Sequence, residues 1–376
     1  MSVFYGNMVC MKKDQELAGI ELLRFICAFV VLIWHYQHFL VLSASDENIL
    51  AQLRSELPLH ALFLPAYKYG YWAVQVFWLI SGFIFYRQYA NSISRRTVSI
   101  GEFSVRRFSR LYPLHFATLL IVALGQTIYL SLHGTSLIYH NNTAVSFAYQ
   151  LFFASSWFSW QQTNFNGPIW SISSEIPVYF LFFLTVRLFG PSVLVALLGW
   201  AISWILSETH FAESFLNPNI LSCAAFFFAG GVVQRFSKYR GTFWVGVGLG
   251  VATAALIALH FCIVDTKTVL VLAASAVIIF SSVEIRVFSP LSFLGNATYS
   301  SYLIHFPLQL FIIILFDQLR LSGSFFFHPA AFIGYLCSVT IVSLAVYQWF
   351  EKPAQDWIRS MFKSSLSPKL RSSSVG

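Results

Sequence analysis

The chain has 376 residues, of which 57% are hydrophobic, 18% are aromatic and only 10% are charged. Soluble domains carry about 25% charged residues, so this composition excludes an ordinary soluble globular protein. The formal net charge of +8 does not indicate nucleic-acid binding, because the basic residues gather in a few connecting segments without basic-aromatic arrays. Apolar runs recur at close to the ~20 residues that a bilayer-spanning helix needs. The sequence therefore predicts a multi-pass membrane protein.

The apolar runs predict an all-α, polytopic membrane helix bundle of about ten transmembrane helices. We expect residues 1–18 to form a cytoplasmic N-terminal tail, 19–350 the transmembrane domain and 351–376 a cytoplasmic C-terminal tail. The predicted spans are Gly19–Leu42, Tyr69–Tyr89, Tyr112–Leu132, Ile169–Phe189, Ser192–Leu206, Ile220–Arg235, Thr242–Phe261, Thr268–Ser282, Leu291–Phe316 and Ala330–Phe350.

The distribution of Lys and Arg sets the expected orientation. With the N-terminus inside, nearly all basic residues of the connections fall on the cytoplasmic side, and the even number of spans returns the C-terminus to that side. The basic residues left outside are Arg54, Lys68, Lys267 and Arg320. The external segment 134–168 contains the apolar stretch Phe147–Phe158, which is too short to cross a bilayer. We expect that stretch to lie at the interface or to re-enter the membrane.

Ionisable residues inside predicted spans are the first indication of a functional site, because burying charge in a bilayer is costly. In the first span, Arg24 and His35 are eleven positions apart, which places them on one helix face about 16 Å apart in depth. The alternative is structural: Arg24 pairs with Glu21 one turn earlier, and His35 bonds to a neighbouring helix. His38 follows one turn later, but two histidines alone are a weak metal signal.

The third and fourth spans add further polar residues near their ends. Arg107 and Arg110 lie on one helix face and can grip phosphate oxygens together, although a run of arginines also serves as a positive-inside anchor. Glu175 follows the start of the fourth span, which we expect at the outer surface, and it either caps that helix or serves substrate. In the ninth span, His305 is expected at a depth similar to those of His35 and Glu175.

The Ser81-Gly82 pair in the second span has a different expected role. Small residues permit close approach of two helices in a membrane, so we expect this pair to serve packing. The five cysteines are scattered without CxxC spacing and predict neither a disulfide framework nor a metal site.

Taken in chain order, these segments resemble the membrane acyltransferase 3 family. The motifs are Arg24 with His35, Phe77 to Phe83, Arg107-x-x-Arg110 before Tyr112-Pro113, Trp170-Ser-Ile-Ser-Ser-Glu175, Tyr302-Leu-Ile-His305-Phe-Pro307 and Glu351-Lys352-Pro353. They extend over nearly the whole chain. Trp78 departs from the family pattern, in which a smaller apolar residue is expected, and should affect packing more than chemistry.

The resemblance implies an O-acyltransferase of the bacterial inner membrane that moves an acyl group, acetyl from acetyl-CoA above all, to a hydroxyl of a glycan, lipid-linked sugar or glycosylated molecule. It has no bound cofactor, since acyl-CoA is a substrate. His35 is the expected general base, since histidine suits that task near neutral pH. The remaining expected site residues are Arg24, Arg107 and Arg110 for the donor phosphates, Trp170, Ser171 and Tyr302 for substrate, and Glu175 and His305 for the reacting groups.

Two roles stay open at this point. Glu175 orients His35 or holds acceptor hydroxyls, and His305 polarises the acyl carbonyl or binds the sugar. A different class of function, a transporter or proton-coupled carrier, also uses buried His, Glu and Arg. Transporters more often show an inverted repeat or paired broken helices, and neither is apparent in this sequence.

Overall fold

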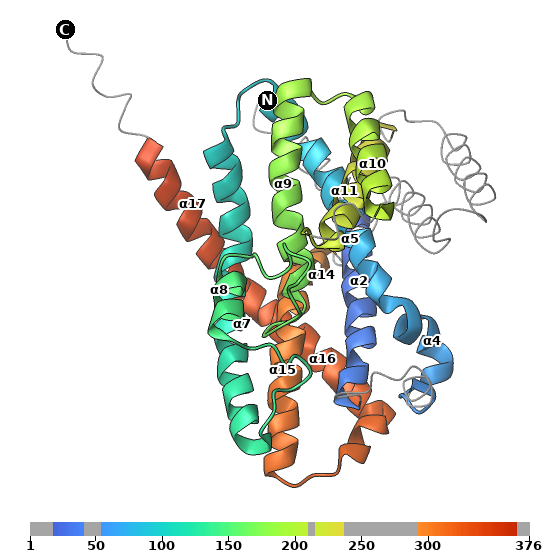
Figure 1. Cartoon of the computed structure of the whole chain (residues 1–376). Coiled ribbons are helices and arrows are strands. Elements are labelled where there is room, and N and C mark those ends of the chain that lie inside the picture. Colours follow the sequence, from blue (N-terminus) through green and yellow to red (C-terminus); the bar gives the residue numbers. More distant parts are fainter. Residues whose placement is uncertain (1–17, 41–53, 210–214, 237–291, 367–376) are drawn as a thin grey trace, which may run out of the picture.

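The computed structural model describes residues 18–40, 54–209, 215–236 and 292–366 (Figure 1). Within these ranges the chain forms helices and no strand, apart from one isolated antiparallel bridge between Phe158 and Leu216. The predicted all-α class is therefore confirmed for the described residues.

The described helices range from single turns to 34 residues. They are α2 (Ala18–Tyr36), η1 (Gln37–Phe39), α4 (His60–Tyr69), η2 (Gly70–Trp72), α5 (Ala73–Gln88), α6 (Ala90–Ser94), α7 (Ile100–His133), α8 (Ala144–Leu151), α9 (Ile169–Phe189), α10 (Val193–Glu208), α11 (Pro218–Phe236), α14 (Ser292–Asn296), α15 (Thr298–Gln318), η4 (Gly323–Phe327), α16 (Pro329–Val346), η5 (Tyr347–Glu351) and α17 (Lys352–Leu366).

Five helical stretches are long and apolar enough to cross a membrane, which supports a membrane protein. They are Gly19–Phe39, Ile100–His133, Ile169–Phe189, Thr298–Gln318 and Pro329–Phe362. Eight of the ten predicted spans fall wholly or mainly on described residues, and each of them overlaps one or more helices. The other two, Thr242–Phe261 and Thr268–Ser282, lie outside the described residues. The count of ten and the cytoplasmic placement of both termini stay predictions.

The helix α9 extends along only part of the height of the bundle, so its start lies deeper in the protein than the ends of α7. In Figure 1, α9 and α7 meet the same end of the molecule, but α9 begins near mid-height. Its 21 residues extend for about 32 Å, against about 51 Å for the 34 residues of α7. Segment 134–168 climbs from the far end of α7 back to the start of α9, and we call it the re-entrant segment for this path through the bundle. Its re-entry into a membrane stays a prediction.

Side-chain amides of the protein hydrogen-bond the irregular backbone of this segment and tie the segment to neighbouring helices. The Gln126 Nε2 donates to the Leu137 carbonyl oxygen at 3.0 Å, and the Leu137 N–H donates to Gln126 Oε1 at 2.9 Å. The Asn166 amide donates to the Leu303 carbonyl oxygen at 3.2 Å. These two contacts anchor the segment to α7 and α15.

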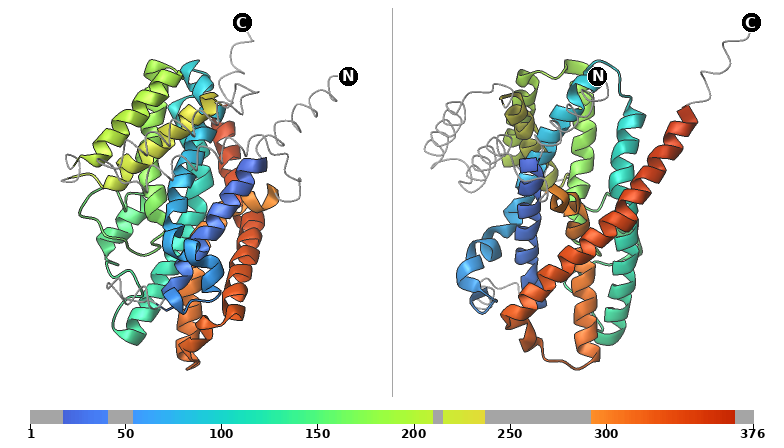
Figure 2. Two further views of the ribbon diagram at one scale, coloured as in Figure 1. Left: turned by 90° about the vertical axis from the view of Figure 1, so that its right-hand side faces the viewer. Right: turned by 180° about the vertical axis from the view of Figure 1, so that it is seen from behind.

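The helix does not end at residue 350, where we place the end of the transmembrane domain, because α16 continues through the π-helical turn η5 into α17 without a break. The combined helix crosses the bundle diagonally (Figure 2). The Arg359 Nε donates to the Ser109 hydroxyl of α7 at 3.2 Å. The apolar pattern ends near Phe350, but packing on α7 extends the helix beyond it. In η5 the Lys352 N–H donates to the Tyr347 carbonyl oxygen, five residues earlier, as in a π-helix. The next residue is Pro353, which has no N–H to donate.

Two apolar clusters fill the described interior, one above the other along α2 and α15. The first includes Val31 and Tyr302, and the second begins at Leu32 and Phe306 on the same helices. His35 and His305 are buried near the junction of the two clusters. The interior therefore places polar side chains between two apolar layers, at the depth where α9 and α15 begin.

Glycines bring α5 and α11 into close contact. A Cβ atom on Gly82 would lie 1.8 Å from the Phe227 carbonyl oxygen, and one on Gly230 would lie 2.0 Å from that of Leu79. The packing role predicted for the Ser81-Gly82 pair is therefore confirmed for Gly82, whereas Ser81 lines a cavity. The unusual Trp78 is fully buried and packs edge-on against Trp170, with ring centroids 5.7 Å apart.

We expect Gly82→Ala to lower the thermal stability of the detergent-solubilised protein, because the added methyl group forces α5 and α11 apart at a cost of about 1–3 kcal/mol. Gly334→Ala in α16 is the matched control, since nothing lies within 4 Å of its Cβ position. That change should leave the melting temperature equal or slightly higher. Equal melting temperatures for both variants would contradict the close contact.

Candidate functional site

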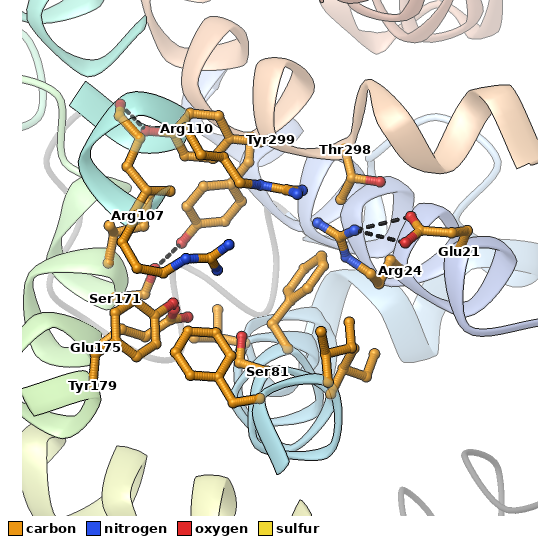
Figure 3. Close-up of a pocket in the computed structure, with 18 of the residues that line it drawn as sticks. Glu21, Arg24, Ser81, Arg107, Arg110, Ser171, Glu175, Tyr179, Thr298 and Tyr299 are labelled. Carbon is orange, nitrogen blue, oxygen red and sulfur yellow. Dashed lines mark hydrogen bonds and ion pairs between the residues drawn. The ribbon is translucent and has the colours of Figure 1, made fainter. Parts of the chain in front are cut away.

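The largest concentration of charged side chains lines a cavity of about 150 Å³ between α2, α5, α7, α9 and the start of α15. Three arginines, Arg24, Arg107 and Arg110, converge there with the carboxyl groups of Glu21 and Glu175 (Figure 3). The three arginines predicted to bind the donor are thus brought together from two helices that are far apart in the sequence. A cavity with this lining is suited to an anionic ligand.

Arg24 adopts the pairing considered as its structural alternative and also faces the cavity. Its Nη1 donates to both carboxylate oxygens of Glu21, at 2.9 and 3.1 Å. Glu21 itself packs against α14, where a Cβ on Gly295 would lie 2.5 Å from the Glu21 Cβ. The pair therefore fixes the Arg24 guanidinium at one wall of the cavity.

Arg107 and Arg110 point into the protein, whereas an anchor for the membrane surface would point outward. The Arg107 guanidinium lies over the Phe85 and Tyr89 rings at 4.9 and 5.6 Å, and its buried Nε has no hydrogen-bond partner among the described residues. Arg110 forms no hydrogen bond with any described residue. By contrast Arg106, in the same run, is exposed and pairs with Glu102 at 2.5 Å. Only Arg106 has the geometry of a surface anchor.

Glu175 lies with the arginines and not with the histidines. The Tyr179 hydroxyl donates to its carboxylate, and both residues line the cavity. The helix-capping alternative is wrong, because the N-cap of α9 is Pro168 and no side chain caps it. The expected orienting contact to His35 is absent from the described contacts. Helical spacing gives the depth of a residue in its own helix, but not the neighbour that it faces.

The first turns of α9 and α15 close the inner end of the cavity. The Ser171 and Tyr302 hydroxyls share a hydrogen bond of 2.7 Å, and both residues line the cavity. On the other side, the Tyr302 ring centroid lies 6.0 Å from that of His305. Tyr302 therefore stands between the arginines and the buried histidines.

His35 and His305 form a buried pair with ring centroids 4.6 Å apart. The His35 Nδ1 contacts the Val31 carbonyl oxygen at 2.9 Å, and the His305 Nδ1 contacts that of Ser301 at 3.3 Å. A carbonyl oxygen only accepts, so these contacts assign the proton of each neutral ring to Nδ1 and leave a lone pair on Nε2. The His305 Nε2 is buried and has no partner among the described residues.

Backbone carbonyls of both histidines hold the pair in place. The Gln309 amide donates to the His35 carbonyl oxygen, and the Tyr335 hydroxyl donates to that of His305, each at 3.1 Å. His38 lies 5.1 Å from His35 between ring centroids. The described side chains include no group of three or more His, Cys, Asp or Glu that could hold a metal ion.

Three predicted site residues do not line the arginine cavity: the buried pair His35 and His305, and Trp170. Trp170 is half-buried and lines a second cavity beside the first turn of α9, among uncharged polar residues. The sequence interpretation missed Tyr299, which lies one turn before Tyr302 and lines the arginine cavity. Helical spacing of three could have found it. It also missed the contact of Glu351, which accepts a hydrogen bond of 2.5 Å from the buried Ser300 hydroxyl.

Comparison with known proteins agrees with the motif order. The family model of the Acyl_transf_3 acyltransferase domain matches residues 17–348, which is nearly the whole chain. No curated protein and no solved structure matches the chain. All six motif segments are described, and all but the last, at Glu351, fall inside the matched range. The chain therefore belongs to the acyltransferase 3 family and is a membrane acyltransferase.

Proposed function

We propose that this protein is an O-acyltransferase of the bacterial inner membrane that moves an acyl group, acetyl from acetyl-CoA, to a hydroxyl of a carbohydrate or glycosylated acceptor. The observation that carries the proposal is the placement of an arginine-lined cavity next to a buried histidine pair, with Tyr302 between them. The family match favours acyl transfer over the alternative of a transporter.

The arginine cavity supplies the donor site in this proposal. Coenzyme A carries phosphate groups, and guanidinium groups bind phosphate with charge-assisted hydrogen bonds. Arg107 Nε and the Arg110 guanidinium keep donors that no described residue uses. With the arginines at the cytoplasmic side, the extended pantetheine arm brings the thioester toward Tyr302.

The histidines supply the proton transfers. His35 Nε2 accepts the proton of the acceptor hydroxyl while its oxygen attacks the thioester carbonyl carbon. The tetrahedral intermediate then collapses, the C–S bond breaks, and the His35 imidazolium returns the proton to the departing thiolate. The products are an ester and free coenzyme A.

The position of the ring proton favours one of the two open roles of His305. With its proton on Nδ1, the His305 Nε2 can accept a hydrogen bond from the acceptor hydroxyl but cannot donate one to the thioester carbonyl. In the hydrogen-bonded pair of Ser171 and Tyr302, one hydroxyl donates to the other and the second stays free to donate to that carbonyl oxygen. We therefore assign His305 to acceptor positioning and Tyr302 to stabilising the developing negative charge.

The direct test of the function measures transfer of radiolabelled acetyl from acetyl-CoA into glycan and lipid extracts, by membranes that contain the protein. We expect label in a hydroxylamine-sensitive ester of the acceptor. Absence of label with every common acyl-CoA donor and host glycan would contradict the proposal.

His35→Gln should lower the transfer rate by about 10²–10⁴-fold, the usual contribution of a general base, while membrane insertion is retained. His38→Gln is the matched control, since it changes a half-buried histidine one turn away. It should keep most of the activity. A His35→Gln protein with more than about a tenth of wild-type activity would rule out the assigned base.

Arg110→Gln should raise the KM for acetyl-CoA by about 10–100-fold, since a hydrogen bond to a charged group contributes about 1.5–3 kcal/mol. The KM for the acceptor should not change. With acetylpantetheine, which has no phosphate, variant and wild type should behave alike. Arg106→Gln, at the exposed position paired with Glu102, is the control. Equal effects of the two substitutions would reduce Arg110 to a topology anchor.

A further inference from the structure

A second cavity, of about 180 Å³, lies on the side of the first α9 turn opposite the arginine cavity. Ser171 lines the arginine cavity, whereas Gly167 and Trp170 line the second one. The other lining residues come from the re-entrant segment and the start of α11: Gln150, Ser155, Ser156, Gln161, Thr163, Asn164, Asn217 and Asn219. Nothing in the proposed transfer chemistry uses this cavity.

Three polar atoms of the lining are buried without a hydrogen-bond partner among the described residues. They are Gln150 Oε1, Ser155 Oγ and Asn164 Oδ1, on side chains that are 1%, 6% and 3% exposed. A buried polar group without a partner costs about 1–3 kcal/mol. Three such atoms in one cavity indicate that a ligand completes their hydrogen bonds.

The orientation of both amides is fixed by their nitrogen atoms. Gln150 Nε2 donates to the Asn164 carbonyl oxygen at 2.9 Å, and Asn164 Nδ2 donates to that of Gln162 at 2.8 Å. The unpaired atoms are therefore carbonyl oxygens, which only accept. A fitting ligand must bring hydrogen-bond donors.

The lining also selects the charge of the ligand. None of the ten lining residues carries an ionisable side chain. An anion such as phosphate would bring only further acceptors, and a cation would find no carboxylate to balance it. Neutral hydroxyl groups meet the requirement, and the indole of Trp170 adds an apolar surface of the kind that a sugar ring can cover. Carbohydrate is the matching ligand chemistry.

The cavity is preorganised and reaches the surface of the protein. Gln161 Oε1 accepts from the Trp157 and Phe158 amides at 2.8 and 2.9 Å, and its Nε2 donates to the Ala154 carbonyl oxygen. These bonds fix the loop that carries Ser155. Thr163 is exposed at the rim, so a ligand can reach the buried oxygens.

A hydrogen bond connects this loop to α15 close to His305 in the sequence. Asn166, two residues after Asn164, donates to the Leu303 carbonyl oxygen, two residues before His305. We propose that the second cavity is a subsite for a neutral sugar ring of the acceptor, held by Gln150, Ser155 and Asn164 while another hydroxyl reaches His35. This inference rests on the proposed function for its role, but the binding itself can be measured separately.

The test uses the full-length protein in nanodiscs and saturation-transfer difference NMR with a panel of neutral methyl glycosides. The panel contains methyl glucoside, galactoside, mannoside and N-acetylglucosaminide, with glucose 6-phosphate and glucuronate as charged probes. We expect saturation transfer to at least one neutral glycoside and weaker transfer to the charged probes. Ser155→Ala and Thr163→Val should each weaken binding by about 2–10-fold, the effect of one neutral hydrogen bond.

Ser155→Phe fills the cavity and should abolish binding. Ser159→Ala is the matched control, because Ser159 lies in the same loop outside the lining. The Ser159→Ala protein should bind neutral glycosides as well as the wild type does. Failure of every neutral glycoside to bind, or undiminished binding by both Ser155→Ala and Thr163→Val, would overturn the subsite even if Ser155→Phe fails to fold.

The outcomes also separate the subsite from the proposed function. Acetyl transfer into an acceptor without glycoside binding would overturn the subsite and leave the transferase. Glycoside binding that Ser155→Ala weakens, in a protein without transfer activity, would support the subsite and overturn the transferase.

Discussion

The meeting of α9 and α15 at mid-height is the constraint on which the site depends. Each helix is shorter than α7, and their first turns join through the Ser171 and Tyr302 hydroxyls at 2.7 Å. Helix starts leave backbone N–H groups without partners inside the helix, so polar groups must gather there. This polar layer is buried between two apolar clusters. In such surroundings an unpaired polar group costs free energy, and a hydrogen-bonded one is held in a fixed orientation.

Three polar compartments surround that junction. The arginine cavity lies on one side of Tyr302 and the histidine pair on the other, while the uncharged cavity lies across the first turn of α9. In the proposed reaction, the arginine cavity binds the donor phosphates, the histidine pair carries out proton transfer, and the uncharged cavity holds a sugar ring of the acceptor. Two helix starts near the assumed position of the thioester also favour negative charge on its oxygen.

The sequence predicted the helices well because long apolar runs mark membrane-spanning segments whether or not their side chains are buried in the protein. It predicted the grouping of Arg24 with Arg107 and Arg110 through the family motifs. It failed for Glu175, since depth along a helix does not give rotation toward a neighbour. The helix across Pro353 was missed because its packing on α7 is a tertiary effect. The uncharged cavity could not be predicted, because segment 134–168 has no periodicity to follow.

The most direct measurement is a structure of the protein with a non-reactive thioether analogue of acetyl-CoA. The proposed mechanism predicts the phosphate groups beside Arg107 and Arg110, with the acyl carbonyl next to the Tyr302 hydroxyl and within reach of His35 Nε2. A nucleotide bound away from the arginine cavity, or an acyl group directed away from the histidine pair, would contradict it.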